Sequence, residues 1–298
     1  MLVGYSLSPG GLLFPYHIGV LACLSNKGYL KDSNPIAGSS AGAIAVASHA
    51  SGVKPETALE ATIRLSDQCL TNHGSARGNL MPFLEKELDF LLPENAHEIL
   101  SNREAIAGLA YKELFPSFRN VLETKYDTRE HVIDSVCNSA MFPFFTTNFP
   151  FRVAKNFDGT SSIPRLVVDG YFSVERSRFG CPDFNVPHAR ATGDEDHKVD
   201  RTVTISVFPH DTISLSASEK HDRISPLPEE DTVKQMTRLL RLATECGSRG
   251  DYTTLYEDGW KDAERWINEE ERRGYWGMDD EERRKVYAAA LEIEKGLN

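Results

Sequence analysis

The chain has 298 residues, of which 40% are hydrophobic and 26% charged, and these fractions are those of an ordinary globular protein rather than a disordered or fibrous one. Its formal net charge at pH 7 is −11 and it has no run of Lys and Arg, which excludes nucleic acid as an expected partner and argues against purely electrostatic attachment to anionic lipid. Five scattered cysteines without a CxxC pair fit reduced thiols in an intracellular compartment, and neither a metal site nor a cofactor is expected.

The first fifty residues alternate between strand-like and helix-like segments. A strand is expected at residues 2–7, a helix from Pro15 to about Gly28, a short strand at residues 35–37 and a helix at residues 41–51. Such alternation favours a mainly parallel sheet covered by helices, which is an α/β fold. No segment resembles a signal peptide or a membrane span, so the chain as given is expected inside the cell.

The middle of the chain continues this pattern. Residues 55–102 have helical spacing, and Asp127 followed by Glu130 predicts a capped helix that ends near Ser139. Short strands are expected at residues 106–111, 119–123, 166–168 and 203–207, and an exposed loop is expected at residues 183–200.

The composition changes after residue 225. From Glu229 onwards the chain is helical in pattern and rich in charges of both signs, with apolar residues at helical spacing around Leu239 and again around Trp260. We expect residues 1–225 to form the main domain and residues 226–298 a helical extension packed on its core. The alternative is that the apolar face of this extension binds lipid or a partner.

A GxSxG sequence, Gly38-Ser39-Ser40-Ala41-Gly42, lies between an expected strand and an expected helix. Glycines on both sides permit a tight turn that exposes the Ser40 hydroxyl, and the following helix points its N-terminal amides toward that hydroxyl. We interpret Ser40 as a nucleophile and Ser39 as its structural neighbour. The alternative is a plain Gly/Ser turn.

The loop at residues 8–13 follows the first expected strand, at the edge where open α/β sheets bind ligands. Gly10 and Gly11 let backbone N–H groups approach a developing oxyanion without interference from a Cβ atom. We therefore expect these two glycines to form an oxyanion hole, with a plain turn as the alternative.

The base that would activate Ser40 distinguishes between protein families. An α/β-hydrolase uses a histidine, and its serine follows several strands, whereas only one expected strand precedes the Ser40 strand here. The histidines after Ser40 fall mostly in expected helices or polar loops, so each is expected at the surface.

Four segments in the same order and spacing resemble the patatin-like phospholipase family. They are GYSLSPGGLLFPYHIGVL, IAGSSAGAIAVASHASG, SVCNSAMFPFF and LVVDGYFS. The short form PGGLLFPYHIGV and the later TVTISVFP look most like the branch that contains the animal triglyceride lipases. The resemblance implies a patatin-like three-layer fold, with a mainly parallel central sheet flanked by helices, for the catalytic domain at residues 1–225.

The resemblance also implies a Ser–Asp dyad without histidine, formed by Ser40 and by Asp169 of the Asp169-Gly170 pair. A carboxylate is a weak base for a hydroxyl unless burial raises its pKa, so Asp169 is expected in an apolar environment. Asp158-Gly159 is a competing pair, interpreted as a turn because no apolar strand precedes it.

The oxyanion loop departs from the family pattern. Pro9 stands where a glycine is usual, Leu13 where many members carry a basic residue, and Phe14 where a glycine often follows. Because proline has no N–H, the hole could be shallower or aimed differently, while Gly10 and Gly11 remain as donors.

The expected function is hydrolysis of carboxylic esters in glycerolipids, whether phospholipid, galactolipid or acylglycerol, through an acyl-enzyme on Ser40. The alternatives are a lipid transacylase with the same dyad and a non-catalytic lipid-binding or regulatory member of the fold. The expected partner is a glycerolipid at a membrane or droplet surface, with peripheral contact through apolar side chains. The candidates for this contact are Phe142, Phe144, Phe145, Phe149 and Phe151, for which core packing is the alternative.

Overall fold

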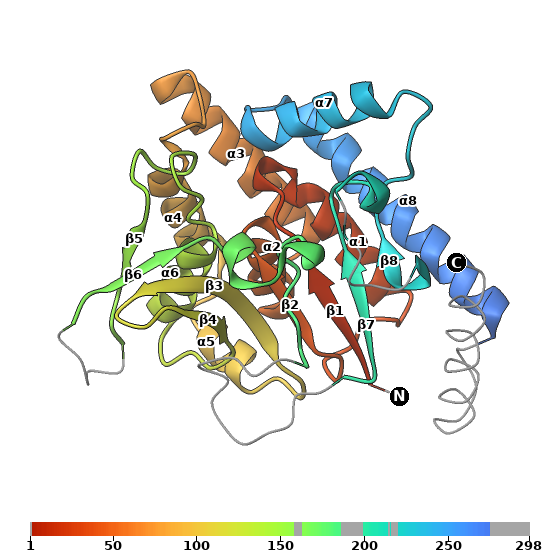
Figure 1. Ribbon diagram of the computed structural model, residues 1–298, viewed down its shortest axis with the longest axis horizontal. Helices are drawn as coiled ribbons and strands as arrows, with labels where there is room; N and C mark the ends of the chain where they lie inside the picture. Colours follow the sequence, from red (N-terminus) through yellow and green to blue (C-terminus); the bar gives the residue numbers. More distant parts are fainter. Residues whose placement is uncertain (1, 158–162, 186–198, 214, 216–219, 275–298) are drawn as a thin grey trace.

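The computed structural model describes residues 2–157, 163–185, 199–213, 215 and 220–274, and strands from these ranges form an eight-stranded sheet (Figure 1). The strands are β1 (Val3–Leu7), β2 (Ile36–Ser39), β3 (Ala107–Phe115), β4 (Arg119–Glu123), β5 (Arg152–Ala154), β6 (Arg165–Val168), β7 (Arg201–Ile205) and β8 (Arg223–Ile224). Their order is β5-β6-β3-β2-β1-β7-β8, and β4 pairs with β3 off this path.

The sheet combines a parallel part with an antiparallel part. Strands β3, β2, β1, β7 and β8 pair in parallel, whereas β4 and β6 run antiparallel to β3, and β5 runs antiparallel to β6. The expected α/β class with a mainly parallel sheet flanked by helices is confirmed. The sequence analysis did not predict β5 and β8, because strands of three and two residues are too short to show a period.

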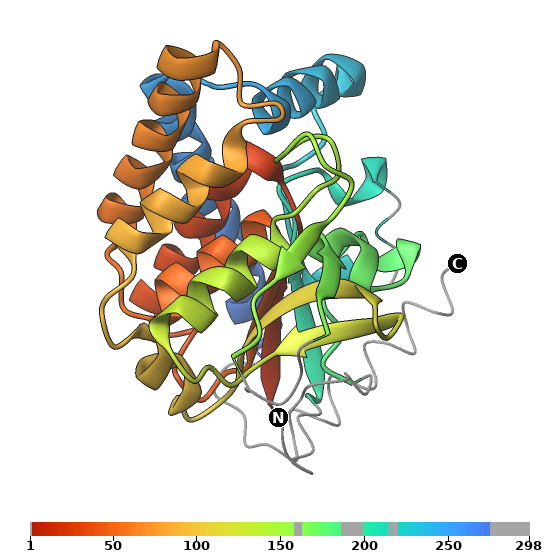
Figure 2. The same cartoon turned by 90° about the vertical axis from the view of Figure 1, so that its left-hand side faces the viewer.

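Eight α-helices in the described ranges surround this sheet. They are α1 (Phe14–Asn26), α2 (Ala41–Ala50), α3 (Pro55–His73), α4 (Leu80–Leu91), α5 (Ala96–Ser101), α6 (Arg129–Ser139), α7 (Thr232–Thr244) and α8 (Arg249–Arg273). Figure 2 shows α3, α4 and α6 together on one face of the sheet. The other face is covered in part by the short helix η2 (Gly170–Ser173) and by Phe184, which packs with Ala37 and Ala110.

The helical pattern of residues 55–102 is confirmed, and it is divided into three helices because Gly74 and Gly78 adopt positive φ values between α3 and α4 and Pro93 follows α4. The expected start of the helix after residue 127 is wrong. The N-cap of α6 is Thr128 rather than Asp127, since the Thr128 hydroxyl accepts a hydrogen bond from the His131 amide at 3.1 Å. The strand expected at residues 203–207 begins two residues earlier, at Arg201.

The C-terminal helix α8 packs closely on α1. A Cβ atom at Gly19 would lie 2.0 Å from the Tyr256 carbonyl oxygen, and one at Gly259 would lie 2.1 Å from the Tyr16 carbonyl oxygen. The two glycines therefore permit the helix backbones to approach each other, and the Tyr16 hydroxyl also donates to Asp262 Oδ2 at 2.8 Å. The domain boundary near residue 225 stays a prediction. Among the described residues, no helix has the length and apolar character needed to cross a bilayer.

A buried ion pair connects α8 to the sheet. Arg201, at the start of β7, donates from both terminal nitrogens to the Glu270 carboxylate at 2.6 and 2.9 Å, and neither side chain is exposed to solvent. Asp222 accepts a further hydrogen bond from Arg201 Nε. The Glu270 carboxylate therefore compensates an arginine charge that water cannot reach.

We expect Glu270→Ala to lower the free energy of unfolding by about 3–5 kcal/mol, because the change leaves a buried guanidinium without its main counter-charge. Urea unfolding monitored by circular dichroism measures this loss. Glu257→Ala, at an exposed position of the same helix, serves as the control and is expected to change the unfolding free energy by less than about 0.5 kcal/mol. Equal effects of the two substitutions would contradict the assigned role of Glu270.

Candidate active site

The sheet brings Ser40 and Asp169 together, although they lie far apart in the sequence. Strand β2 runs parallel to β3 and ends with Ser39 opposite Ala110, while β6 runs antiparallel to β3 and ends with Val168 opposite Lys112. The two strands thus approach the same stretch of β3 from opposite directions (Figure 1). The residues that follow them, Ser40 and Asp169, meet in the gap between their ends.

Ser40 occupies a strained turn between β2 and α2. Its φ and ψ of 53° and −119° are unfavourable for a residue with a side chain, and such strain is typical of functional sites. The flanking glycines permit the turn, because a Cβ atom at Gly38 would lie 2.3 Å from the Gly42 carbonyl carbon, and one at Gly42 would lie 2.7 Å from the Leu7 carbonyl oxygen. The Ser139 hydroxyl accepts from the Ser40 amide at 2.9 Å and fixes the turn to α6.

The Asp169 carboxyl group is fully buried, and burial raises its pKa from the usual value near 4 to about 7. A hydrogen bond from the Tyr171 amide to Oδ1, 2.8 Å long, and the adjacent Ser40 side chain both lower the pKa, but by less than burial raises it. Oδ2 accepts no hydrogen bond from any residue in the described ranges. One carboxylate oxygen of a weakly acidic group is therefore available beside Ser40.

The loop after β1 places Gly10 and Gly11 in the lining of the same cavity as Ser40. Their amides donate to no acceptor in the described part of the chain, whereas the Gly10 carbonyl accepts from Leu13 at 3.1 Å. Gly11 has a positive φ of 57°, and a Cβ atom there would lie 2.2 Å from the Ala243 carbonyl oxygen of α7. Helix α7 thus packs against the loop and requires glycine at this position.

A buried histidine forms a hydrogen bond to the same loop. His17 Nε2, on α1, donates to the carbonyl oxygen of Ser8 at 2.8 Å, and burial lowers the pKa of His17 to about 4. The ring is therefore neutral near pH 7. Pro9 lies between this anchored carbonyl and the two glycines, so its missing N–H removes one donor but leaves the position of the loop defined.

The expectation that the histidines after the serine motif lie at the surface is wrong for His131, His210 and His221. All three are buried. The ring of His131 accepts a hydrogen bond from the Asp127 amide, and the ring of His210 bonds to the Thr204 hydroxyl. A single sequence pattern does not reveal burial of a histidine, because a buried imidazole needs only one local partner.

The structure also distinguishes Ser40 from its neighbour Ser39. The Ser39 side chain is buried and its hydroxyl donates to the carbonyl oxygen of Gly180, away from the Ser40 turn. Gly170 follows Asp169 at a point where a Cβ atom would lie 2.3 Å from both the Ala110 carbonyl oxygen and the Ser39 Cβ. The competing pair Asp158-Gly159 and the histidines His188 and His197 lie outside the described residues.

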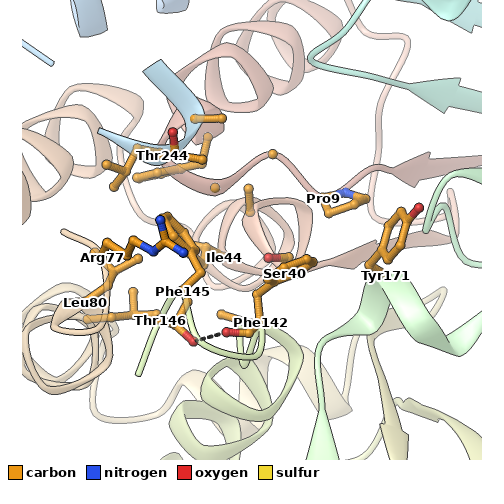
Figure 3. Close-up of a pocket in the computed structure, with 18 of the residues that line it drawn as sticks. Pro9, Ser40, Ile44, Arg77, Leu80, Phe142, Phe145, Thr146, Tyr171 and Thr244 are labelled. Atoms are coloured by element: carbon orange, nitrogen blue, oxygen red, sulfur yellow. Dashed lines mark hydrogen bonds between the residues drawn. The ribbon is translucent and has the colours of Figure 1, made fainter. Parts of the chain in front are cut away.

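Ser40 opens into a cavity of about 710 Å³ (Figure 3). This volume lies within the range of sites that bind small ligands or lipid chains. The loop with Gly10 and Gly11 forms one part of the wall, and the other parts come from α2, from the region between α3 and α4, from the segment after α6 and from the end of α7. Most lining side chains are apolar, including Phe14, Ile44, Leu65, Leu80 and Leu84.

Several residues of this site were not predicted from the sequence. Ser139 and His17 position the Ser40 turn and the glycine loop, Arg77 lines the cavity between α3 and α4, and Ala243 and Thr244 line it from α7. His17 and Ser139 lie within two of the segments that resemble the family, but those segments do not reveal their hydrogen-bond partners. No sequence signal marks Arg77, Ala243 or Thr244, because each lines the cavity through a contact with a distant segment. Within the described ranges, no group of three or more His, Cys, Asp or Glu side chains is placed to hold a metal ion.

Comparisons with known proteins identify the family of the chain. The sequence model described as "Patatin-like phospholipase" matches residues 5–174, which is more than half of the chain. No curated protein sequence matches the chain. Among solved structures, the crystal structure of VipD from Legionella pneumophila is similar with a TM-score of 0.36 and 11% identity, covering 90% of this chain and 67% of VipD. On the extent of the family match, the chain belongs to the patatin-like phospholipase family, whose activity at family level is hydrolysis of acyl esters in lipids.

Proposed function

We propose that the protein hydrolyses carboxylic ester bonds of glycerolipids through an acyl-enzyme on Ser40, with Asp169 as the general base. The observation that supports this most strongly is the meeting of the strained Ser40 turn with a buried carboxyl group whose pKa is near 7. A base with a pKa near the working pH combines a large ionised fraction with enough basicity to accept a proton.

The proposed reaction has two steps. Asp169 Oδ2 takes the proton of the Ser40 hydroxyl while Oγ attacks the acyl carbonyl carbon, and the amides of Gly10 and Gly11 donate to the resulting oxyanion. Collapse of this intermediate breaks the ester bond, and the departing alcohol takes the proton from Asp169. Water then attacks the acyl-enzyme with Asp169 as base again, which releases a fatty acid and restores Ser40.

The cavity offers a place for the acyl chain. Phe14, Ile44, Leu65 and Leu84 line both the main cavity and a smaller void that continues between α3 and α4. An alkyl chain that binds there is transferred from water to an apolar surrounding, and this transfer stabilises the complex by about 0.8 kcal/mol for each buried CH₂ group. The likeness of the motifs to the triglyceride lipase branch makes acylglycerol one of the substrates to be compared.

We also propose that the substrate is reached by peripheral contact with a lipid surface. Phe142, Phe144, Phe149 and Phe151 are exposed by 40%, 58%, 68% and 39%, while Phe145 is partly buried and packs against the core. Phe142 and Phe144 line the cavity together with Ser40, so the exposed rings of this segment begin at the cavity wall. Aromatic side chains in such a position support reversible attachment without a net attraction between charges.

The function is tested by incubating the protein with diacylglycerol and phospholipid dispersions, with and without glycerol, and identifying the products by mass spectrometry. Free fatty acid is the expected product, together with labelling of Ser40 by a fluorophosphonate. Transfer of the acyl group mainly to glycerol would identify a transacylase instead. Absence of both labelling and acyl products would identify a non-catalytic member of the fold.

A further inference from the structure

A cationic side chain shares the cavity with Ser40. Arg77 lies in the segment between α3 and α4, and its guanidinium group points into the cavity rather than away from it (Figure 3). Most of the surrounding wall is apolar, with Ile44 and Phe145 nearby in the same view. Arg77 is exposed to solvent, so water hydrates its charge until an anionic ligand takes the place of that water.

Two backbone hydrogen bonds join the residues just after Arg77 to the segment that follows α6. The Gly78 amide donates to the Phe145 carbonyl oxygen at 2.5 Å, and the Met81 amide donates to the Thr146 carbonyl oxygen at 2.9 Å. Both acceptors belong to a segment that itself lines the cavity. The backbone that follows Arg77 is therefore joined to a segment that lines the same cavity as Ser40, which places the origin of the Arg77 side chain at the cavity wall.

Arg77 forms no ion pair with any residue that the structure describes. In the ranges that the structure describes, no carboxylate oxygen lies within 4.0 Å of its nitrogens, whereas the arginines at 64, 129, 152, 165 and 201 all form ion pairs. Glu245, at the end of α7, is the carboxylate residue of the described lining and makes no ion pair with Arg77. The cavity lining thus includes a solvent-exposed guanidinium that forms no ion pair with a described residue and is available to an anionic ligand.

We propose that Arg77 binds the phosphate of a glycerophospholipid whose acyl ester is attacked by Ser40, and that it makes lipids with a phosphate better substrates than uncharged acylglycerols. This inference rests on the proposed function. The planar guanidinium can donate two parallel hydrogen bonds to phosphate oxygens. In a glycerophospholipid the phosphate and the neighbouring acyl ester are attached to adjacent glycerol carbons, so a phosphate on Arg77 keeps the ester within the same cavity.

The test compares phosphatidic acid with diacylglycerol of identical acyl chains, at equal mole fraction in micelles of a non-ionic detergent. In Arg77→Gln, the ratio of kcat/KM for phosphatidic acid to that for diacylglycerol is expected to fall about ten- to a hundredfold, because a hydrogen-bonded charge is lost. In Arg77→Lys the same ratio is expected to lie between those of the unaltered protein and Arg77→Gln. An ammonium group keeps the positive charge but cannot donate two parallel hydrogen bonds to a phosphate. Arg272 is exposed on α8, and Arg272→Gln removes the same charge as Arg77→Gln, so this control is expected to leave the ratio unchanged.

A binding measurement separates this inference from the activity itself. Diether phosphatidic acid, which has no ester bond to be cleaved, is expected to bind the Ser40→Ala protein about ten- to a hundredfold more weakly once Arg77→Gln is added. Diether glycerol is expected to bind both proteins equally. Inorganic phosphate is expected to compete only at much higher concentration, because it lacks the chains that fill the apolar cavity.

Each opposite result has a distinct meaning. An unchanged substrate ratio in Arg77→Gln, with hydrolysis that still depends on Ser40, would overturn the role of Arg77 and leave the proposed function intact. Inorganic phosphate that competes as tightly as the diether lipid would identify a site for free phosphate. An anionic detergent could also raise the hydrolysis of diacylglycerol by as much as phosphatidic acid exceeds diacylglycerol. That result would assign the preference for phosphatidic acid to the negative charge of the micelle surface and not to Arg77. Absence of hydrolysis and of Ser40 labelling in the unaltered protein would instead reject the proposed function.

Discussion

Replacing Ser40 by alanine is expected to lower ester hydrolysis by about 10⁴-fold or more, because the acyl-enzyme can no longer form. The Ser40 side chain is largely buried, and its backbone amide bonds to the Ser139 hydroxyl, which does not depend on the Ser40 side chain. The fold of the variant should therefore persist. Hydrolysis of a soluble short-chain ester, with circular dichroism as the measure of folding, gives both results.

Ser39→Ala is the matched control for this substitution. It removes the hydrogen bond from the Ser39 hydroxyl to the Gly180 carbonyl oxygen, and a buried carbonyl left unsatisfied costs about 1–3 kcal/mol of stability. The rate of hydrolysis per folded molecule is expected to stay within about tenfold of the unaltered protein. If Ser40→Ala retained more than a few per cent of the activity, or if Ser39→Ala were equally inactive, Ser40 would not be the nucleophile.

Replacing Asp169 by asparagine is expected to lower kcat/KM by about 10²- to 10⁴-fold, which is the usual contribution of a positioned general base. Asparagine has nearly the same shape, and its side-chain oxygen can still accept the hydrogen bond from the Tyr171 amide. It cannot accept the Ser40 proton at pH 7. The expected loss is therefore chemical and not a consequence of unfolding, and fluorophosphonate labelling should slow in parallel with hydrolysis.

The pH profile provides a second measurement of the same residue. Burial raises the pKa of Asp169 to about 7, and only the ionised carboxylate can accept a proton. kcat/KM of the unaltered protein should thus fall about tenfold per pH unit as the pH decreases below 7, and it should level off above about 8. Asp169→Asn is expected to lose this inflection near pH 7.

His17 is the histidine to compare with Asp169, because it contacts the glycine loop. Its pKa of about 4 means that it is neutral throughout the pH range in which Asp169 ionises, so it does not account for an inflection near 7. His17→Asn is expected to reduce activity by displacing the Ser8 carbonyl while leaving the inflection in place. A histidine substitution that abolished both the activity and the inflection would favour a triad over the proposed dyad.

Local sterics explain why the Ser40 turn could be predicted from the sequence. Gly38 and Gly42 flank Ser40 at a strand–helix junction, and the structure places each glycine where a Cβ atom would meet backbone atoms. Both the residues that form the turn and the residues that permit it lie within one short segment. The same holds for the βαβα order of the first fifty residues, because hydrophobic periods and helix caps are local properties of the chain.

The sequence by itself determined the α/β class, the serine turn and the glycine loop, while the arrangement around them depended on tertiary contacts. Asp169 reaches Ser40 because β2 and β6 meet along β3, and strand pairing between distant segments leaves no local pattern. Arg77 likewise lines the same cavity as Ser40 because the residues after it bond to the segment after α6, and α7 packs on Gly11 although more than 200 residues separate them in the sequence. A local pattern records which face of an element is apolar, but the folded chain alone decides which other element that face meets.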